Sequence, residues 1–91
     1  MSLILKFTSA GFTMQKYNEA IKQLNAAGAG SPKGRQYHVC SGSAEGVHIT
    51  DVWDSMEDFE AFGKTLLPIL NSLSVDPGQP EVQQVHNIIV G

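Results

Sequence analysis

Four residues of this chain together suggest proton-transfer chemistry. They are His38, Asp51, Trp53 and His86. Asp51 and Trp53 lie two residues apart, so a β-strand would present both on one face. There the carboxylate would orient an imidazole, which acts as general base toward an acidic phenol or enol. The indole would stack on the substrate ring. The same set also fits a structural role, as hydrogen-bonded groups in a subunit interface.

Some of these residues could instead bind a metal ion. His38 and Cys40 lie two residues apart, and with Asp51 and His86 they offer nitrogen, sulfur and oxygen ligands. Their spacing matches no recognised ligand pattern, so we predict no metal and no other cofactor. Cys40 as a nucleophile is a weaker alternative, because a free cysteine in the middle of a strand is more often a small buried apolar residue.

Three residues are expected to contact the substrate without reacting: Trp53, Lys6 and Cys40. The Lys6 ammonium would neutralise an anionic substrate, or else extend to the rim of an interface. His48 has the opposite strand parity from Asp51, so it joins the cluster only if a β-bulge shifts the alternation.

Composition narrows the possible partners. The net charge is −3, and the six Lys and Arg residues are scattered, which argues against nucleic acid binding. The single cysteine excludes an intrachain disulfide, and no segment is long and apolar enough to span a membrane. The first residues lack a basic region and a cleavage site, so a reducing cytoplasm is the expected location.

The elements that must position these residues follow from hydrophobic periodicity. Thr13 is placed to N-cap a first helix, and Ser55 begins a capping-box pattern before a second. Pro68 predicts a kink or break near Leu67 in that second helix. Gly42 and Gly46 are expected to supply unusual φ values in a tight hairpin connection. The predicted strands cover residues 2–8, 36–41, 47–53 and 82–90.

The order β-α-β-β-α-β predicts one α+β domain over residues 1–91 with the ferredoxin-like plan. In this plan two helices cover one face of a four-stranded antiparallel sheet. Strand parity assigns a nearly all-apolar set to the helix-covered face: Leu3, Leu5, Phe7, Val39, Thr50, Val52, Val85 and Ile89. It assigns a mixed set to the opposite face: Ile4, Lys6, His38, Cys40, Ile49, Asp51, Trp53, His86 and Ile88. A face that is half apolar and also carries polar groups suits neither open solvent nor a dry core. We therefore predict that a second copy of the chain covers this face in an isologous homodimer and closes a cavity there.

The run from Gly46 to Phe62, with Leu67-Pro68 and His86-Asn87 after it, resembles the dimeric α/β-barrel superfamily, and within it small antibiotic-biosynthesis-monooxygenase-like proteins. The most specific piece is the strand-ending pattern V-W-x-S-x-E-x-F-x-x-F. The resemblance implies paired sheets forming a dimeric α/β barrel, a ligand pocket and often no metal or cofactor. Haem-degrading relatives place a histidine on the second helix, and residues 56–73 contain none.

Three functional hypotheses follow for this small-molecule-binding homodimer. The first is a cofactor-independent monooxygenase acting on an aromatic or polyketide-like substrate, with His38 or His86 as base, Asp51 as orienter and Trp53 as stacking wall. The second is a non-catalytic binding or accessory module with the same pocket. The third is a structural dimer whose polar face only fixes register. Fold alone does not choose among them.

Overall fold

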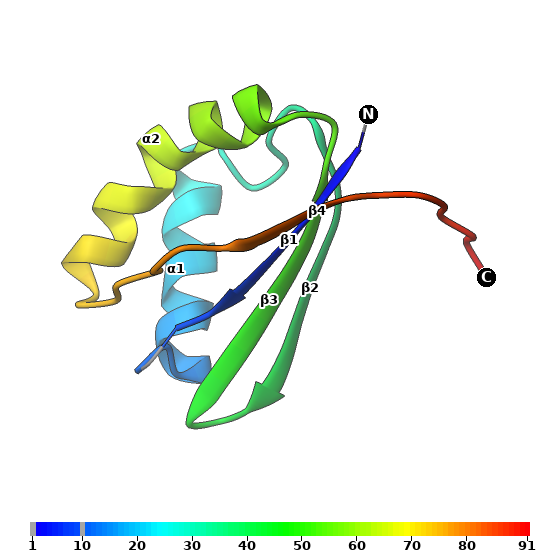
Figure 1. Cartoon of the computed structure of the whole chain (residues 1–91). Coiled ribbons are helices and arrows are strands. Elements are labelled where there is room, and N and C mark those ends of the chain that lie inside the picture. The colour runs from blue at the N-terminus through cyan, green and yellow to red at the C-terminus, as the bar shows by residue number, and fades with distance from the viewer. Residues whose placement is uncertain (1, 10) are drawn as a thin grey trace.

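The computed structural model describes residues 2–9 and 11–91, which form six elements in the predicted order (Figure 1). Their bounds are β1 (Leu3–Thr8), α1 (Met14–Ala26), β2 (Arg35–Ser43), β3 (Gly46–Trp53), α2 (Met56–Ser72) and β4 (Glu81–Gln84). The strands pair antiparallel in the order β2-β3-β1-β4, and both helices cover the same face of this sheet. The ferredoxin-like α+β prediction is therefore confirmed.

Both helices begin where the capping residues predict. The Thr13 side chain accepts a hydrogen bond from the backbone N–H of Lys16, and the Ser55 side chain accepts one from that of Asp58. Each cap satisfies one of the backbone donors that a helix start leaves unpaired. α2 continues through Pro68, so the predicted break is absent. No helix in the described residues is long and apolar enough to cross a membrane.

The hairpin between β2 and β3 turns at residues 44–45, directly after the pair formed by Ser43 and Gly46. Gly42 has a φ of +109°, and a Cβ atom there would lie 2.5 Å from the carbonyl oxygen of Gly46. Only glycine fits that position. Gly46 itself does not have a positive φ, so the prediction of an unusual φ is right for Gly42 and wrong for Gly46.

The core between the sheet and the helices consists of two hydrophobic clusters. One joins the hairpin end of β3 to both helices, and its buried members are Phe12, Ala20, Val47, Ile49, Leu70 and Val75. The other lies at the opposite end of β3 and contains Leu5, Leu24, Trp53 and Phe62. Trp53, Phe59 and Phe62 of the V-W-x-S-x-E-x-F-x-x-F pattern belong to this second cluster, so the pattern supplies its aromatic side chains on and next to α2.

The predicted division of side chains between the two sheet faces is wrong for β2 and β3. The register pairs Leu5 with Asp51 and Phe7 with Ile49, so these residues share the helix-covered face. The face away from the helices, here called the open face, carries the other parity: Ile4, Lys6, Val39, His48, Thr50 and Val52. The alternation of side chains along each strand was predicted correctly. For β2 and β3, however, the set predicted to face the helices lies on the open face, and the set predicted for the open face lies against the helices. The polar residues are thus in the core layer.

The chain after β4 also departs from the predicted strand over 82–90. β4 ends at Gln84, because its partner β1 begins at Leu3, opposite Gln84. One more backbone bond, from Val85 N–H to the Ser2 carbonyl, ends the pairing. Residues 85–91, here called the C-terminal arm, then leave the domain (Figure 1).

Candidate functional site

The sheet register brings the two central candidates together. His38 on β2 lies directly opposite Asp51 on β3, and both side chains are on the helix-covered face. His38 Nδ1 is 2.6 Å from Asp51 Oδ1, a short distance typical of a hydrogen bond to an ionised acceptor. Asp51 is only 4% exposed. A buried carboxylate needs such donors to offset its loss of hydration.

Trp53 supplies the second donor to this carboxylate. Its Nε1–H lies 3.3 Å from Asp51 Oδ2, so both carboxylate oxygens have partners. The indole is 0% exposed and packs against Phe59 and Phe62, with ring centroids 5.5 and 5.4 Å away. In this structure the ring is a core residue that positions Asp51, and it offers no exposed surface to a substrate ring.

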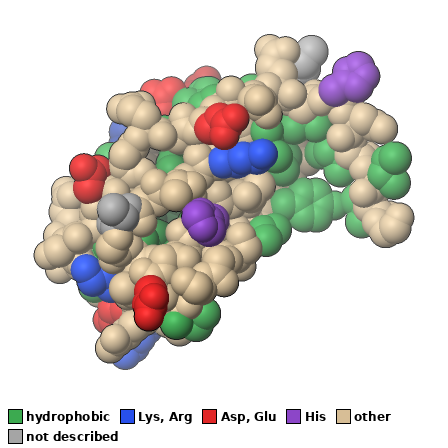
Figure 2. Space-filling model, turned by 60° about the horizontal axis from the view of Figure 1, so that its bottom comes forward, with side chains coloured by type: hydrophobic (Ala, Val, Ile, Leu, Met, Phe, Trp, Pro, Cys, Tyr) green, Lys and Arg blue, Asp and Glu red, His purple; other side chains and the backbone are tan. Residues whose placement is uncertain are grey.

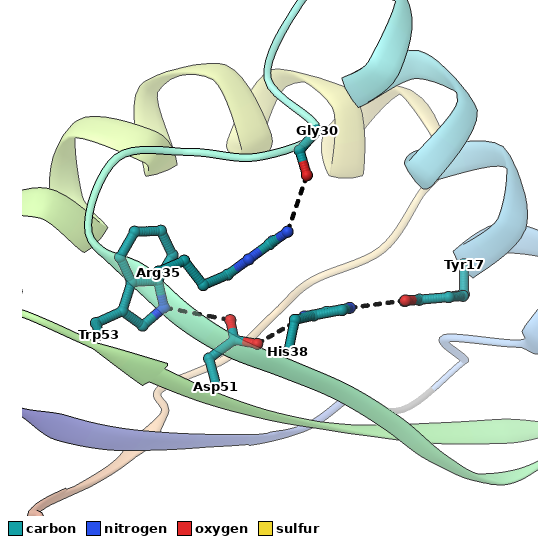
Figure 3. A network of polar contacts seen from close by, with 6 residues as sticks. All are labelled: Tyr17, Gly30, Arg35, His38, Asp51 and Trp53. Atoms are coloured by element: carbon teal, nitrogen blue, oxygen red, sulfur yellow. Dashed lines mark hydrogen bonds and ion pairs between the residues drawn. The ribbon is translucent and has the colours of Figure 1, made fainter.

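A third group from the first helix extends the pair. Tyr17 on α1 places its Oη 2.7 Å from His38 Nε2, giving a continuous chain Asp51–His38–Tyr17 (Figure 3). A carboxylate only accepts hydrogen bonds, so the Nδ1 nitrogen carries the proton that His38 donates to Asp51. In a neutral imidazole the Nε2 lone pair then accepts the Tyr17 O–H. The network assigns this tautomer.

Burial raises the pKa of the Tyr17 phenol above its ordinary value. The negative charges that Cys40 and Asp51 carry when ionised raise this pKa further, and the positive charge of Arg35 lowers it. Tyr17 therefore remains a neutral hydroxyl near physiological pH, able both to donate and to accept a hydrogen bond.

Arg35 is also close to this network. In the part of the chain that the structure describes, it is the one Lys or Arg residue that lines the cavity between the sheet and the helices, which is described in the next paragraph. Its Nη2 donates a hydrogen bond to the Gly30 carbonyl at 3.0 Å, and its guanidinium lies 5.8 Å from the centre of the Phe62 ring (Figure 3). These two contacts fix the guanidinium at the edge of the core, where it can face an anionic group.

The Asp51–His38–Tyr17 chain borders a cavity between the sheet and the helices. Its volume is about 60 Å³, and its walls are mainly apolar side chains from β1, α1 and α2. Ser9 and Pro77 line it from the loops beside the sheet, and a 3.1 Å hydrogen bond from Ser9 Oγ to the Pro77 carbonyl joins these loops. A polar chain that ends in an apolar cavity is the usual composition of a small-molecule site.

The structure does not bring the other candidates into this network. Lys6 and His48 are exposed on the open face, where His48 Nδ1 lies 3.3 Å from Thr8 Oγ1. His86 is exposed on the C-terminal arm. Cys40 is on the helix-covered face and half-buried against the core, and burial raises the pKa of its thiol.

Within residues 2–9 and 11–91, no three His, Cys, Asp or Glu side chains are grouped so that they could hold a metal ion. His38 and Asp51 already bond each other, and His86 is on the arm. The ligand set drawn from the sequence is therefore not assembled in this part of the chain.

Sequence reasoning missed Tyr17 and Arg35 as site residues. Tyr17 lies on α1 among the residues that pack against the core, and no sequence motif marked it as a site residue. The available signal was chemical: a tyrosine on a core stripe needs a hydrogen-bond partner for its hydroxyl. The partner could be found only once the helix was placed over His38. Arg35 gave no comparable signal, because it stands at the end of a glycine-rich loop.

Comparison with known proteins supports the fold. No family model matches the sequence, and no curated protein matches it. Among solved structures, SnoaB, a cofactor-independent oxygenase from Streptomyces nogalater, superposes with a TM-score of 0.62 at 14% identity, covering 97% of this chain and 94% of that one.

Two further structures are antibiotic-biosynthesis-monooxygenase-like proteins. The one from Deinococcus radiodurans has a TM-score of 0.60 at 15% identity, and the one from Chloroflexus aurantiacus has 0.57 at 21%. Each comparison covers 99% of this chain and 97% of the other. The chain therefore has the antibiotic-biosynthesis-monooxygenase-like fold, as its strand-ending pattern predicts.

Proposed function

We propose that this protein is a homodimeric, cofactor-independent oxygenase that deprotonates the phenol or enol of an aromatic, polyketide-like substrate and lets the resulting anion react with O₂. The observation that carries the proposal is the Asp51–His38–Tyr17 chain ending at an apolar cavity. The fold shared with SnoaB, a cofactor-independent oxygenase, adds support. The base and the cavity are what such chemistry needs from a protein, since the substrate itself is the reductant.

The first step is proton transfer. The His38 imidazole takes the proton of the substrate, and the imidazolium that forms donates its Nδ1–H to the Asp51 carboxylate. Asp51 is held by Trp53 on its other oxygen, so it is oriented before the substrate arrives. Arg35 lies beside the cavity and would stabilise the negative charge left on the substrate.

The second step is oxidation by O₂. In the enol form of an anthrone, loss of the O–H proton leaves an anion whose ring CH carbon bonds to O₂ and, with the proton that His38 took, forms a hydroperoxide. The C–H bond and the O–O bond then break, so that one oxygen atom stays in the new C=O group and the other leaves as water. The two hydrogens of this water are the former C–H hydrogen and the proton returned by His38, and four electrons pass from the substrate to O₂. No further oxidant or reductant is needed. The apolar walls of the cavity would keep bulk water from the anion.

The cavity must widen to hold such a substrate. At about 60 Å³ it is smaller than the roughly 150 Å³ that accommodates one benzene ring. The wall that can move most easily is formed by Ser9 and Pro77, because these residues belong to loops and not to the sheet or helices. We expect their hydrogen bond to break when the ligand enters.

Replacing the three histidines one at a time tests the proposal. With a hydroxyanthrone as substrate, O₂ consumption and quinone formation are measured for His38→Gln, His48→Gln and His86→Gln. His38→Gln should lower the rate roughly 10²- to 10⁴-fold, as expected for loss of a general base. His48→Gln is the matched control, since His48 lies on the opposite face of the same sheet.

Each outcome of this histidine series has a definite meaning. Equal rates for His38→Gln and the wild-type protein would rule out the proposed base. A large loss of activity in His86→Gln alone would identify His86, on the C-terminal arm, as the general base, which is the alternative predicted from the sequence. Absence of quinone formation with any hydroxyanthrone, together with saturable binding, would favour the non-catalytic binding module. The observation that favours a non-catalytic binding module is the small cavity, whose polar side chains already form hydrogen bonds with one another.

The homodimer is part of the same proposal. The open face leaves Val39 53% exposed, and on the C-terminal arm Ile89 and Val90 are 81% and 75% exposed. Figure 2 shows hydrophobic side chains in the hollow between the body of the domain and the projecting arm. Seven extended residues reach up to roughly 23 Å, more than the roughly 14 Å width of a four-stranded sheet. The arm is thus long enough to cover the open face of a second copy.

Replacing the apolar residues of the arm should break this dimer. The triple substitution Ile88→Ser, Ile89→Ser and Val90→Ser removes side chains whose full burial stabilises by roughly 1.5–3 kcal/mol each. We expect native mass spectrometry to show a dimer for the wild-type protein and a monomer for the triple variant. Leu67→Ser, an exposed apolar residue on α2, is the control and should remain dimeric. A wild-type monomer would contradict the dimer directly.

A further inference from the structure

We infer that the group that meets the substrate is the Tyr17 phenol, which passes the substrate's proton to His38. This inference rests on the proposed function and assigns the first acceptor at the same site. Its starting point is that the reactive nitrogen of His38 is already occupied, since Nε2 lies 2.7 Å from Tyr17 Oη. With Nδ1–H donated to Asp51, the neutral imidazole has one lone pair, and Tyr17 covers it.

Packing holds Tyr17 in this position. Its ring lies nearly parallel to the His38 imidazole, with an interplanar angle of 6° and a centroid distance of 5.8 Å. On another side the Phe12 ring lies 6.0 Å away. A substrate can therefore reach His38 Nε2 only by displacing a packed aromatic ring. Tyr17, His38 and Asp51 all line the cavity, but the one lone pair that His38 could offer to a substrate is covered by the Tyr17 hydroxyl, which ends the hydrogen-bonded chain (Figure 3).

The relay moves one proton without any oxidant or reductant. The substrate hydroxyl gives its proton to Tyr17 Oη, while Tyr17 gives its own proton to His38 Nε2. The products are a substrate anion that accepts a hydrogen bond from the Tyr17 hydroxyl, and an imidazolium that donates to both Tyr17 and Asp51. The oxygen of Tyr17 is neutral before and after the transfer, so no buried phenolate is left behind.

The surroundings of Tyr17 fit this role. Burial raises its pKa, so the phenol keeps a proton to pass on at neutral pH. The charged groups that act on it are Cys40, Arg35 and Asp51, and the effect of burial is larger than that of any of them. A fixed phenolate base would need the opposite shift.

Two tyrosine variants test the relay, because the chain contains only two tyrosines. Tyr17→Phe keeps the packed ring and removes the hydroxyl, and Tyr37→Phe makes the same change at a residue that is 42% exposed on β2. Two quantities are measured in each: quinone formation from a hydroxyanthrone, and the ionised fraction of bound 4-nitrophenol at a pH below the pKa of that probe in water. Thermal unfolding shows whether each variant is folded.

The relay predicts that Tyr17→Phe lowers quinone formation roughly 10²-fold and abolishes ionisation of the bound probe, while Tyr37→Phe changes neither. Unchanged values in Tyr17→Phe would show that the ring only packs. Higher values would show that Tyr17 merely blocks His38. Either result overturns the inference.

The probe separates the relay from the oxygenase function. A wild-type protein that ionises 4-nitrophenol through Tyr17 but forms no quinone would support the relay and overturn the oxygenase. A wild-type protein that binds 4-nitrophenol without ionising it would overturn the relay, whatever its activity toward hydroxyanthrones.

Discussion

Asp51→Asn should lower quinone formation by roughly 10³-fold or more while leaving the fold intact. The carboxylate accepts from both His38 and Trp53, and Trp53 can only donate. An asparagine that keeps its oxygen toward Trp53 must turn its amide N–H toward His38. His38 Nδ1 then becomes an acceptor, and the proton moves to Nε2. The imidazole is left in the tautomer that cannot accept a proton from Tyr17, the kind of defect that costs other carboxylate–histidine sites several orders of magnitude.

The matched control for this prediction is Asp54→Asn, which changes the same group next to the end of β3. Asp54 is exposed, and its Oδ1 accepts a hydrogen bond from the Gln36 side chain. Circular dichroism of both variants establishes folding, and quinone formation is compared at equal protein concentration. Activity in Asp51→Asn close to the wild-type value would mean that the tautomer of His38 is irrelevant to the reaction.

Trp53→Ala should produce the largest loss of stability. The indole is fully buried and packs against two phenylalanine rings of α2. Truncating such a side chain costs about 3–5 kcal/mol, against a total of roughly 5–15 kcal/mol for a natural domain. It also removes one donor to the buried Asp51 carboxylate. We expect the urea midpoint, followed by circular dichroism, to fall sharply or the variant to be unfolded.

Leu67→Ala provides the comparison, since Leu67 is 47% exposed on α2. Its free energy of unfolding should stay within about 0.5 kcal/mol of the wild-type value. Trp53→Phe should lie between the two, because it keeps an aromatic ring but leaves Asp51 Oδ2 without the indole donor. A Trp53→Ala variant as stable as Leu67→Ala would show that the core around β3 is not organised as described.

The local features of the fold could be predicted from sequence because each has a local cause. Thr13 and Ser55 can cap a helix through their own side chains, and Gly42 is required by contacts within one hairpin. Alternation along a strand likewise determined that His38 and Cys40 share one face and that Asp51 and Trp53 share one. These relations need no knowledge of the rest of the chain.

The phase between strands could not be obtained in this way. Alternation does not determine which face of β3 packs against the helices. Because Asp51 is an acidic residue, its face of β3 was predicted to lie away from the helices. The interactions that determine this face join residues far apart in the sequence. Trp53 packs on α2, and His38 together with Trp53 donates hydrogen bonds to the Asp51 carboxylate. The same holds for the chain after Gln84. Its residues favour a strand, but the ladder with β1 ends at the pair formed by Leu3 and Gln84.

Ionisation of the substrate in the absence of oxygen tests the central claim most directly. A hydroxyanthrone is mixed with the protein under anaerobic conditions, near neutral pH, and the absorption of its anion is recorded for wild type and Asp51→Asn. A site that takes the proton through Tyr17 and His38 should give the bound anion in the wild-type protein and leave the bound molecule neutral in the variant. A neutral hydroxyanthrone bound to the wild-type protein would contradict the proposed proton transfer.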